Sequence, residues 1–177
     1  FPKVTLVGIL WADLNLHFPV YNAAETTLQQ LIQVAGRAGR CQAGAQVIVQ
    51  AMMDHPVFKY LNEVDYLRFY ESELTARDSV GYPPCLRLAE IELKSSDEQN
   101  LETEAFQLAL TLNNIINKSS IQARVLGPAK PPVSKIKNTH ARKIYLKSES
   151  MAAIIELYKK IDQRNFKSSI FFTPNPQ

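Results

Sequence analysis

Residues 23–40 read AAETTLQQLIQVAGRAGR, and this stretch decides the fold of the first part of the chain. Its apolar residues recur at helical spacing and share one stripe: Leu28, Leu31, Ile32 and Ala35. Asn22 stands just before the stretch, and Glu25 comes three residues after Asn22, which approximates a capping box at a helix start. The pattern predicts one amphipathic helix over residues 23–40.

Apolar runs rich in β-branched residues flank this helix on both sides. Residues 4–10, VTLVGIL, form a continuous run that is typical of a strand buried on both faces of a parallel sheet. Residues 44–52, GAQVIVQAM, alternate and predict a second strand. Strand, helix and strand in this order make a βαβ unit, so we expect residues 1–53 to be the end of an α/β domain.

The remainder of the chain predicts a connecting helix and a second, smaller domain. Residues 54–80 predict one long helix with Pro56 in its first turn, which the turn GYPPC at 81–85 ends. After this turn, elements are expected in the order β-α-β-β-α-β, over residues 87–95, 97–118, 123–128, 141–147, 150–162 and 166–172. This is the split βαβ, ferredoxin-like order. We therefore expect a connecting helix and Pro turn at 54–84 and a C-terminal α+β domain at 85–177.

Composition excludes several classes of protein. The 177 residues contain no tract near the ~20 apolar residues that a membrane span needs, so no membrane association is expected. Cys41, Cys85 and the three histidines are scattered without metal-ligand spacing, which predicts reduced cytosolic thiols and no metal site. The chain begins FPKVTLVGIL, without Met and inside an apolar run, and we expect it to be cut from a larger protein.

Charge is distributed unevenly along the chain. Residues 105–148 contain eight basic residues and no Asp or Glu, which indicates an electropositive face. Five residues of this stretch are the candidate DNA contacts: Lys130, Lys135, Lys137, Arg142 and Lys143. The alternative is an ordinary solvated loop, because lysine is a common surface residue. We favour contact with the DNA backbone, since no nearby carboxylate in the sequence compensates this charge.

The first predicted helix contains two glycines near its end, in the string QVAGRAGR at residues 33–40. A glycine in a helix interior costs about 0.5–1 kcal/mol relative to alanine, so Gly36 and Gly39 suggest a close approach of the backbone to something. Arg37 and Arg40 suggest that this partner is an anion, and guanidinium groups match phosphate oxygens two at a time. The alternative is a solvated helix end, where positive charge is favourable against the helix dipole.

The full string Q-x-x-G-R-x-G-R resembles the sixth conserved motif of superfamily 2 helicases, with five specified positions within eight residues. Its flanks are similar to the PriA-type replication restart helicases, or primosomal protein N-prime. The segments that carry this likeness are DHPV, DYLRFYESELTARDSVGYPP and VLGPAKPPVSKIKNTHARKIYLKS, and with the motif they cover nearly the whole chain. The resemblance implies that residues 1–53 end the second RecA-like lobe of a helicase and that residues 85–177 bind DNA.

The resemblance also implies roles for the motif residues. Arg40 would be the arginine finger on the γ-phosphate of ATP, and Arg37 and Gln33 would couple the nucleotide to the lobe interface. Gly36 and Gly39 would allow close approach of the nucleotide. The family usually has an Asp-x-Asp pair after the apolar strand, but Trp11 replaces the first acid here, so Asp13 alone is carried over as nucleotide-binding. The chain ends FFTPNPQ, where the family tends to have an acidic strand end.

Ligands and partners follow from the same resemblance. ATP and Mg²⁺ would be bound mainly by an upstream lobe, because this chain has no G-K-[ST] phosphate loop. Zinc is expected in the full-length protein but not in this part, which alone should not hydrolyse ATP. The whole protein would recognise stalled forks, unwind DNA from 3′ to 5′ and start primosome assembly in the bacterial cytoplasm, at the nucleoid. Its partners would be forked and single-stranded DNA, primosome proteins and single-stranded-DNA-binding protein. The alternatives are another superfamily 2 translocase or a non-enzymatic nucleic-acid-binding module.

Overall fold

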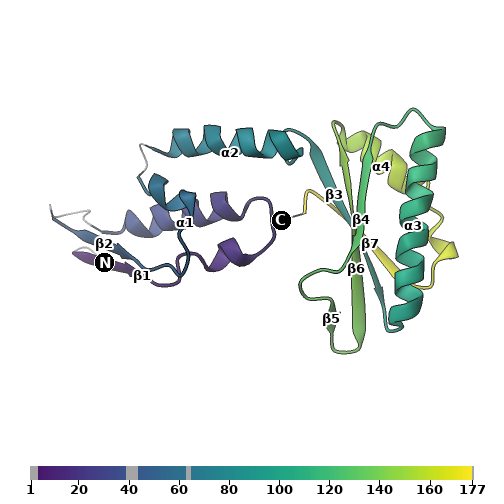
Figure 1. Ribbon diagram of the computed structural model, residues 1–177, viewed down its shortest axis with the longest axis horizontal. Helices are drawn as coiled ribbons and strands as arrows, with labels where there is room; N and C mark the ends of the chain where they lie inside the picture. Colours follow the sequence, from purple (N-terminus) through teal and green to yellow (C-terminus); the bar gives the residue numbers. More distant parts are fainter. Residues whose placement is uncertain (1–3, 39–43, 63–64, 177) are drawn as a thin grey trace. The chain divides into compact units, whose positions relative to one another are not determined.

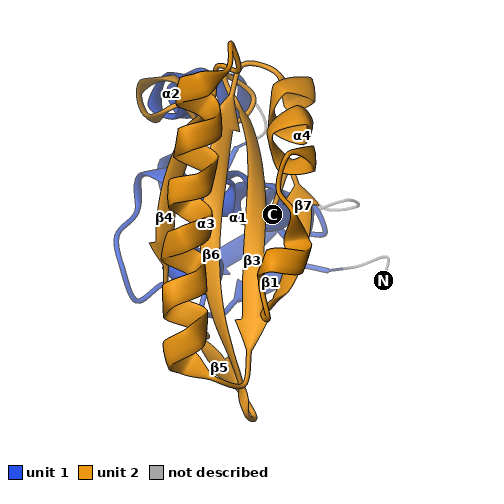
Figure 2. Ribbon diagram, turned by 90° about the vertical axis from the view of Figure 1, so that its right-hand side faces the viewer, with its two compact units in different colours: residues 1–77, 177 blue, residues 78–176 orange. Residues whose placement is uncertain are grey.

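A computed structural model gives the structure of the chain and describes residues 4–38, 44–62 and 65–176. The chain divides into two compact units, residues 1–77 with Gln177 and residues 78–176, which are coloured separately in Figure 2. The elements are mixed α and β, and among the described residues they include a small parallel sheet and a five-stranded antiparallel sheet (Figure 1).

The first unit contains the βαβ arrangement that the sequence predicts. Strand β1 (Leu6–Ile9) is followed by α1 (Ala23–Ala35) and then by β2 (Gln46–Val49), and the two strands pair in parallel with Leu6 opposite Gln46. The 3-10 helix η1 (Leu14–His17) lies between β1 and α1. The small core of the first unit is formed by Leu28, Val57 and Phe69, all of them buried.

Three details of the first unit differ from the sequence expectations. Helix α1 ends at Ala35, so the single helix over 23–40 is too long. Asn22 makes no side-chain capping bond, and the Glu25 carboxylate accepts from Gln29 and Arg77. The prediction of one long helix over residues 54–80 is also wrong.

Two separate helices stand in its place. The 3-10 helix η2 (Pro56–Tyr60) has His55 at its N-cap, where the imidazole Nδ1 accepts from the Val57 amide at 3.2 Å. The α-helix α2 (Tyr66–Val80) then begins six residues later.

The strands of the parallel pair are more exposed than expected. Leu6 is 57 % exposed and Ile48 is 58 % exposed, although both belong to apolar runs that suit a strand buried on two faces. Only two strands pair in the described part of this sheet, so few neighbouring residues cover the faces of β1 and β2.

The second unit has the β-α-β-β-α-β order expected from the sequence, with one short strand added. The elements are β3 (Arg87–Ser95), α3 (Glu98–Lys118), β4 (Arg124–Ala129), β5 (Lys135–Ile136), β6 (Thr139–Ser148), α4 (Met151–Lys159) and β7 (Ser169–Pro174). A short 3-10 helix, η4 (Gln163–Asn165), precedes β7. The strand order is β4-β6-β3-β7, all antiparallel, with β5 paired to β6. Central strands β3 and β6 therefore come from different halves of the sequence pattern, as in a split βαβ arrangement.

Helices α3 and α4 cover one face of this sheet (Figures 1 and 2). The core lies between them and the sheet, and alternate strand residues enter it, such as Ile91 and Leu93 of β3 and Ile144 of β6. The residues between them, such as Glu90 and Lys143, belong to the opposite face. This alternation decides which basic residues of β6 are available to a ligand.

Candidate functional site

The glycine–arginine motif begins in the last turn of α1. Gln33 is exposed on the helix, Gly36 is its C-cap, and Arg37 is exposed in the turn that follows. Gly36 has φ −64°, which any residue adopts, and a Cβ there would lie 3.3 Å from the Ile32 carbonyl oxygen. Gly39 and Arg40 lie outside the described residues. The structure therefore brings Gln33, Gly36 and Arg37 together at one helix end.

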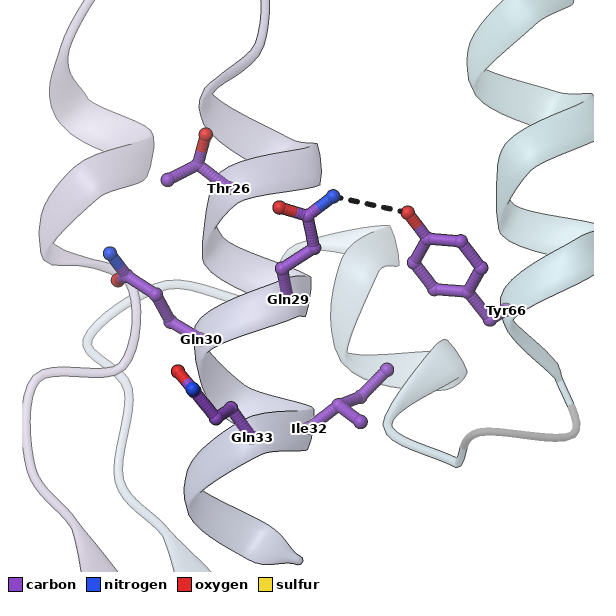
Figure 3. Close-up of a pocket in the computed structure, with 6 residues that line it drawn as sticks. All are labelled: Thr26, Gln29, Gln30, Ile32, Gln33 and Tyr66. Carbon is purple, nitrogen blue, oxygen red and sulfur yellow. Dashed lines mark hydrogen bonds between the residues drawn. The ribbon is translucent and has the colours of Figure 1, made fainter.

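A pocket of about 660 Å³ lies along α1 beside Gln33 (Figure 3). It is lined by Thr26, Gln29, Gln30, Ile32, Gln33 and Tyr66. The Gln29 amide donates to the Tyr66 hydroxyl at 3.2 Å, and the Gln30 oxygen accepts from the Asn15 amide at 2.9 Å. These lining residues include no Lys or Arg, so the pocket suits a neutral hydrogen-bonding group better than a phosphate.

Sequence reasoning missed this pocket, although a signal for it was present. The polar side of the amphipathic helix carries three glutamines, with Gln30 one position and Gln33 four positions after Gln29. Tyr66, by contrast, comes from a helix far along the chain, and no pattern in the sequence predicts that it reaches Gln29.

Asp13 follows β1 and is buried, with its carboxylate against the residues that follow β2. Its carboxylate accepts hydrogen bonds from the backbone amides of Met52 and Met53, each at 3.0 Å, and the His17 ring lies 3.6 Å away. Burial alone would raise the pKa of Asp13, but these amide bonds and the nearby His17 hold it below its ordinary value. The carboxylate is 1 % exposed, and its placement favours a structural role over direct nucleotide contact.

The candidate DNA-contacting residues of the second unit do not form one patch. Arg142 is opposite Leu93 in the register, on the face that the helices cover, and it is 2 % exposed. Its guanidinium donates to Glu98 at 2.9 Å and to Glu102, both on α3. Burial alone would lower the pKa of Arg142, but the two glutamates raise it. This placement favours a structural role, and we leave Arg142 out of the DNA contacts proposed below.

Lys143 and Lys147 belong to the opposite face of the same strand. Lys143 pairs with Glu90 of β3 at 3.0 Å. Lys147 donates to the Val80 carbonyl at 2.8 Å, and its ammonium lies 3.8 Å from the centre of the Tyr82 ring. Both cations are therefore engaged within the unit, and the pKa of Lys147 is lowered by burial and by the nearby Arg124.

Lys130, Lys135 and Lys137 are exposed in and before the β5–β6 hairpin. Lys130 lies 3.3 Å from Glu98, with its side chain 62 % exposed. Within the described residues, Lys135 and Lys137 have no acidic partner within 4 Å. Three of the eight basic residues of the acid-free stretch, Lys130, Arg142 and Lys143, are thus paired with glutamates of β3 and α3.

Neither a membrane-spanning helix nor a cluster of metal ligands is present in the described ranges. None of the helices there is both long and apolar enough to cross a lipid bilayer. Within those same ranges, no three His, Cys, Asp or Glu side chains gather in a way that could hold a metal ion.

Comparison with known proteins gives a consistent result. The family model described as "Primosomal protein N C-terminal domain" matches residues 78–174. The replication restart protein PriA of Bacillus subtilis is 33 % identical over 183 residues, which cover 98 % of this chain and 22 % of that protein. The proteins of the same name from Synechocystis and Treponema pallidum are 31 % and 32 % identical, covering 91 % and 87 % of this chain and 19 % and 23 % of theirs. The chain spans about a fifth of the length of these relatives.

Proposed function

The chain belongs to the family of the replication restart protein PriA, and we propose that it forms the C-terminal part of an ATP-dependent DNA helicase of this kind. In this proposal the whole protein recognises stalled replication forks, unwinds DNA from 3′ to 5′ and starts primosome assembly. The observation that carries the proposal is the match to such relatives over nearly the whole chain, motif and C-terminal unit together.

We propose that the first unit supplies half of an ATPase site and belongs to the second RecA-like lobe. Arg40 is the arginine finger of this site, and Arg37 and Gln33 link the nucleotide to the lobe interface. The exposure of Arg37 and Gln33 at one helix end supports this role, because an exposed side chain can meet a phosphate held by another segment. Asp13 acts indirectly, by holding the backbone of Met52 and Met53 in place.

The residues of this chain fit ATP only in part. The sequence contains no phosphate loop, and the pocket beside Gln33 has a neutral lining, so neither holds a triphosphate and Mg²⁺ alone. The γ-phosphate would be held elsewhere in the longer protein, and this chain would contribute positive charge that stabilises the transition state. Zinc, expected for the full-length protein, finds no ligand cluster in the described part of this chain.

The experiment that tests the ATPase role uses a full-length family member that contains this chain. Arg40→Ala should reduce DNA-stimulated ATP hydrolysis by roughly 10³-fold or more, while the affinity for fork DNA stays nearly constant. Arg40→Lys should rescue poorly, since lysine lacks the planar fork of donors. Arg68→Ala is the matched control, because Arg68 is an exposed arginine of the same unit whose side chain is 80 % exposed.

Two results would contradict this assignment. Near-normal turnover of Arg40→Ala would remove Arg40 from the site. DNA-stimulated ATP hydrolysis by the purified 177-residue chain would show that the site is complete without another lobe, contrary to the proposal.

We propose that the second unit binds the DNA backbone through its exposed lysines, chiefly Lys130, Lys135 and Lys137. Their exposure and the lack of acidic partners around the last two support this role. With two to three phosphates contacted, the slope of log affinity against log salt should be roughly −2 to −3. A titration of labelled fork DNA at three salt concentrations measures it, and affinity without any salt dependence would contradict backbone contact. Primosome proteins and single-stranded-DNA-binding protein are the protein partners we propose.

A further inference from the structure

The β5–β6 hairpin is fixed at its base by a cluster of charges. Glu98, the first residue of α3, lies within 3.3 Å of three side-chain nitrogens: Lys130 Nζ, His140 Nδ1 and Arg142 Nη2. The Ala141 amide also donates to the Ser134 carbonyl at 2.9 Å, which closes the hairpin. The hairpin lies at one end of the sheet, near the start of α3 (Figure 1). The base of the hairpin is therefore held by the contacts of Glu98 and by the hydrogen bond between Ala141 and Ser134.

The tip of the same hairpin is exposed and combines two kinds of side chain. Lys135 and Lys137 are exposed cations, and Lys137 occupies the turn with φ 55°. Val133 is 65 % exposed and Ile136 is 64 % exposed, so the same hairpin also exposes two aliphatic side chains. The sequence from residue 129 to 139 contains no Asp or Glu.

We propose that this hairpin tip, residues 133–139, is a wedge that binds nucleic acid at a strand junction. Lys135 and Lys137 hold phosphates on the strands that separate, and Val133 and Ile136 cover the face of the last base pair. The proposal rests on the DNA binding proposed above and adds where the contact lies and which DNA structure it prefers.

The combination of side chains is the argument for a junction. Phosphates along a continuous duplex attract lysine but offer no apolar surface to an exposed valine or isoleucine. At a junction the stacking face of a terminal base pair is open, and aliphatic side chains are known to act as wedges against stacked bases, between base steps. Positive charge without nearby carboxylates favours a nucleic acid over an acid-poor protein surface as the occupant of this tip.

The contacts at the base of the hairpin support the proposed wedge. A wedge has to hold its side chains in place while stacked bases resist it, and a hairpin of two paired residues on its own is only marginally stable. This support comes from the ion pairs of Glu98 with Lys130 and Arg142, which join the hairpin to helix α3.

The test measures binding of the chain to two DNAs of equal length and composition, a three-way fork and a continuous duplex, by fluorescence anisotropy. The wild-type chain should prefer the fork. The double variant Val133→Ser with Ile136→Ser should lower fork affinity about threefold or more and leave duplex affinity unchanged. The double variant Lys135→Gln with Lys137→Gln should weaken both DNAs and reduce the salt slope by roughly 1–2.

Matched controls come from the helical side of the unit. Leu110→Ser changes an aliphatic residue that is also 64 % exposed, and Lys118→Gln with Lys159→Gln removes two exposed charges. Neither control should change the preference for the fork, and circular dichroism checks that every variant is folded.

The possible outcomes separate the two proposals. A chain that binds neither DNA would contradict the proposed DNA binding itself. Salt-dependent binding that the Val133 and Ile136 variant leaves at the level of the controls would overturn the wedge alone. Equal loss on fork and duplex for the Val133 and Ile136 variant would also overturn it, because a wedge requires the junction.

Discussion

The guanidinium of Arg142 donates to the Glu98 carboxylate across 2.9 Å, joining the central strand β6 to the first residue of α3. Glu102, one turn further along the helix, accepts from the same guanidinium. Arg142 is buried, whereas both glutamates are partly exposed. An arginine in this position acts on the fold first, and on any ligand only through it.

Arg142→Met should therefore destabilise the second unit. Removing one member of a buried pair typically costs about 3–5 kcal/mol, and the exposure of the glutamates reduces this to roughly 1–3 kcal/mol. Hydrogen exchange of peptides from β3 and β6 measures the loss. Arg164→Ala, at a pair whose arginine is 90 % exposed, should change little and serves as the control. Unchanged protection in Arg142→Met would contradict the structural role.

Glu104 gives the second unit an acid-sensitive contact. Its buried carboxylate accepts from the Lys167 and Ser168 amides, each at 2.8 Å. Burial alone would raise the pKa of Glu104, but hydrogen bonds from Ser168 and Lys167 hold it below its ordinary value of 4.5. A lowered pKa means that this stability is present above about 4.5 and is lost as the pH falls through the folded-state value.

Glu104→Gln should cost roughly 1–3 kcal/mol at pH 7 and flatten the loss of stability in acid. Denaturant melts between pH 7 and pH 3 give both quantities. Glu156→Gln is the control, since that side chain is 59 % exposed. A variant with the same acid dependence as the wild type would show that another group titrates.

Tyr145 contributes to the pH dependence of stability at alkaline pH. Burial, and then the charge and hydrogen bond of Glu90, raise the pKa of Tyr145 to about 12. A raised pKa means that stability present below about 10 is lost as the pH rises towards 12. Tyr145→Phe should remove this part of the alkaline loss. Absorbance of the phenolate against pH, compared between the two proteins, measures the titration, and a Tyr145 that ionises near 10 would contradict the prediction.

Arg77 links two helices of the first unit. Its guanidinium lies 2.9 Å from Glu25 of α1 and 3.1 Å from Glu73 of α2. Arg77→Ala should destabilise this unit by about 1–3 kcal/mol, because it leaves two carboxylates without their cation. Arg68→Ala, at an exposed pair, should change stability by less than about 0.5 kcal/mol. Hydrogen exchange of α1 and α2 peptides distinguishes the two, and equal effects would contradict the link.

The sequence pattern predicted most elements because their own residues carry the signal. Alternation of Ala89, Ile91 and Leu93 marks β3, and the long apolar stripe of α3 marks the helix that covers it. The end of η2 at Tyr60 and the separate start of α2 at Tyr66 carried no such signal, since apolar spacing continues across both positions. The two-residue strand β5 is too short for any period to be read.

The candidate site was predicted less completely, because its partners come from distant elements. The sequence shows that residues 105–148 lack carboxylates, but not that Glu90 and Glu98 reach Lys143 and Arg142 across the sheet and from α3. Strand alternation could have shown that Arg142 and Lys143 belong to opposite faces, so one DNA strand could not meet both from one side. The pairing of Gln29 with Tyr66 depends on tertiary packing alone.

The position of β7 beside β3 has a consequence for synthesis. The last strand of the second unit, β7, pairs along its first strand, β3, and Asn175 donates to the Leu88 carbonyl at 2.9 Å. While the ribosome is still translating, β3 therefore has one unpaired edge and its sheet stays open, however long the earlier elements have been outside the exit tunnel. The nascent unit exposes a template for pairing with other chains until β7 has emerged.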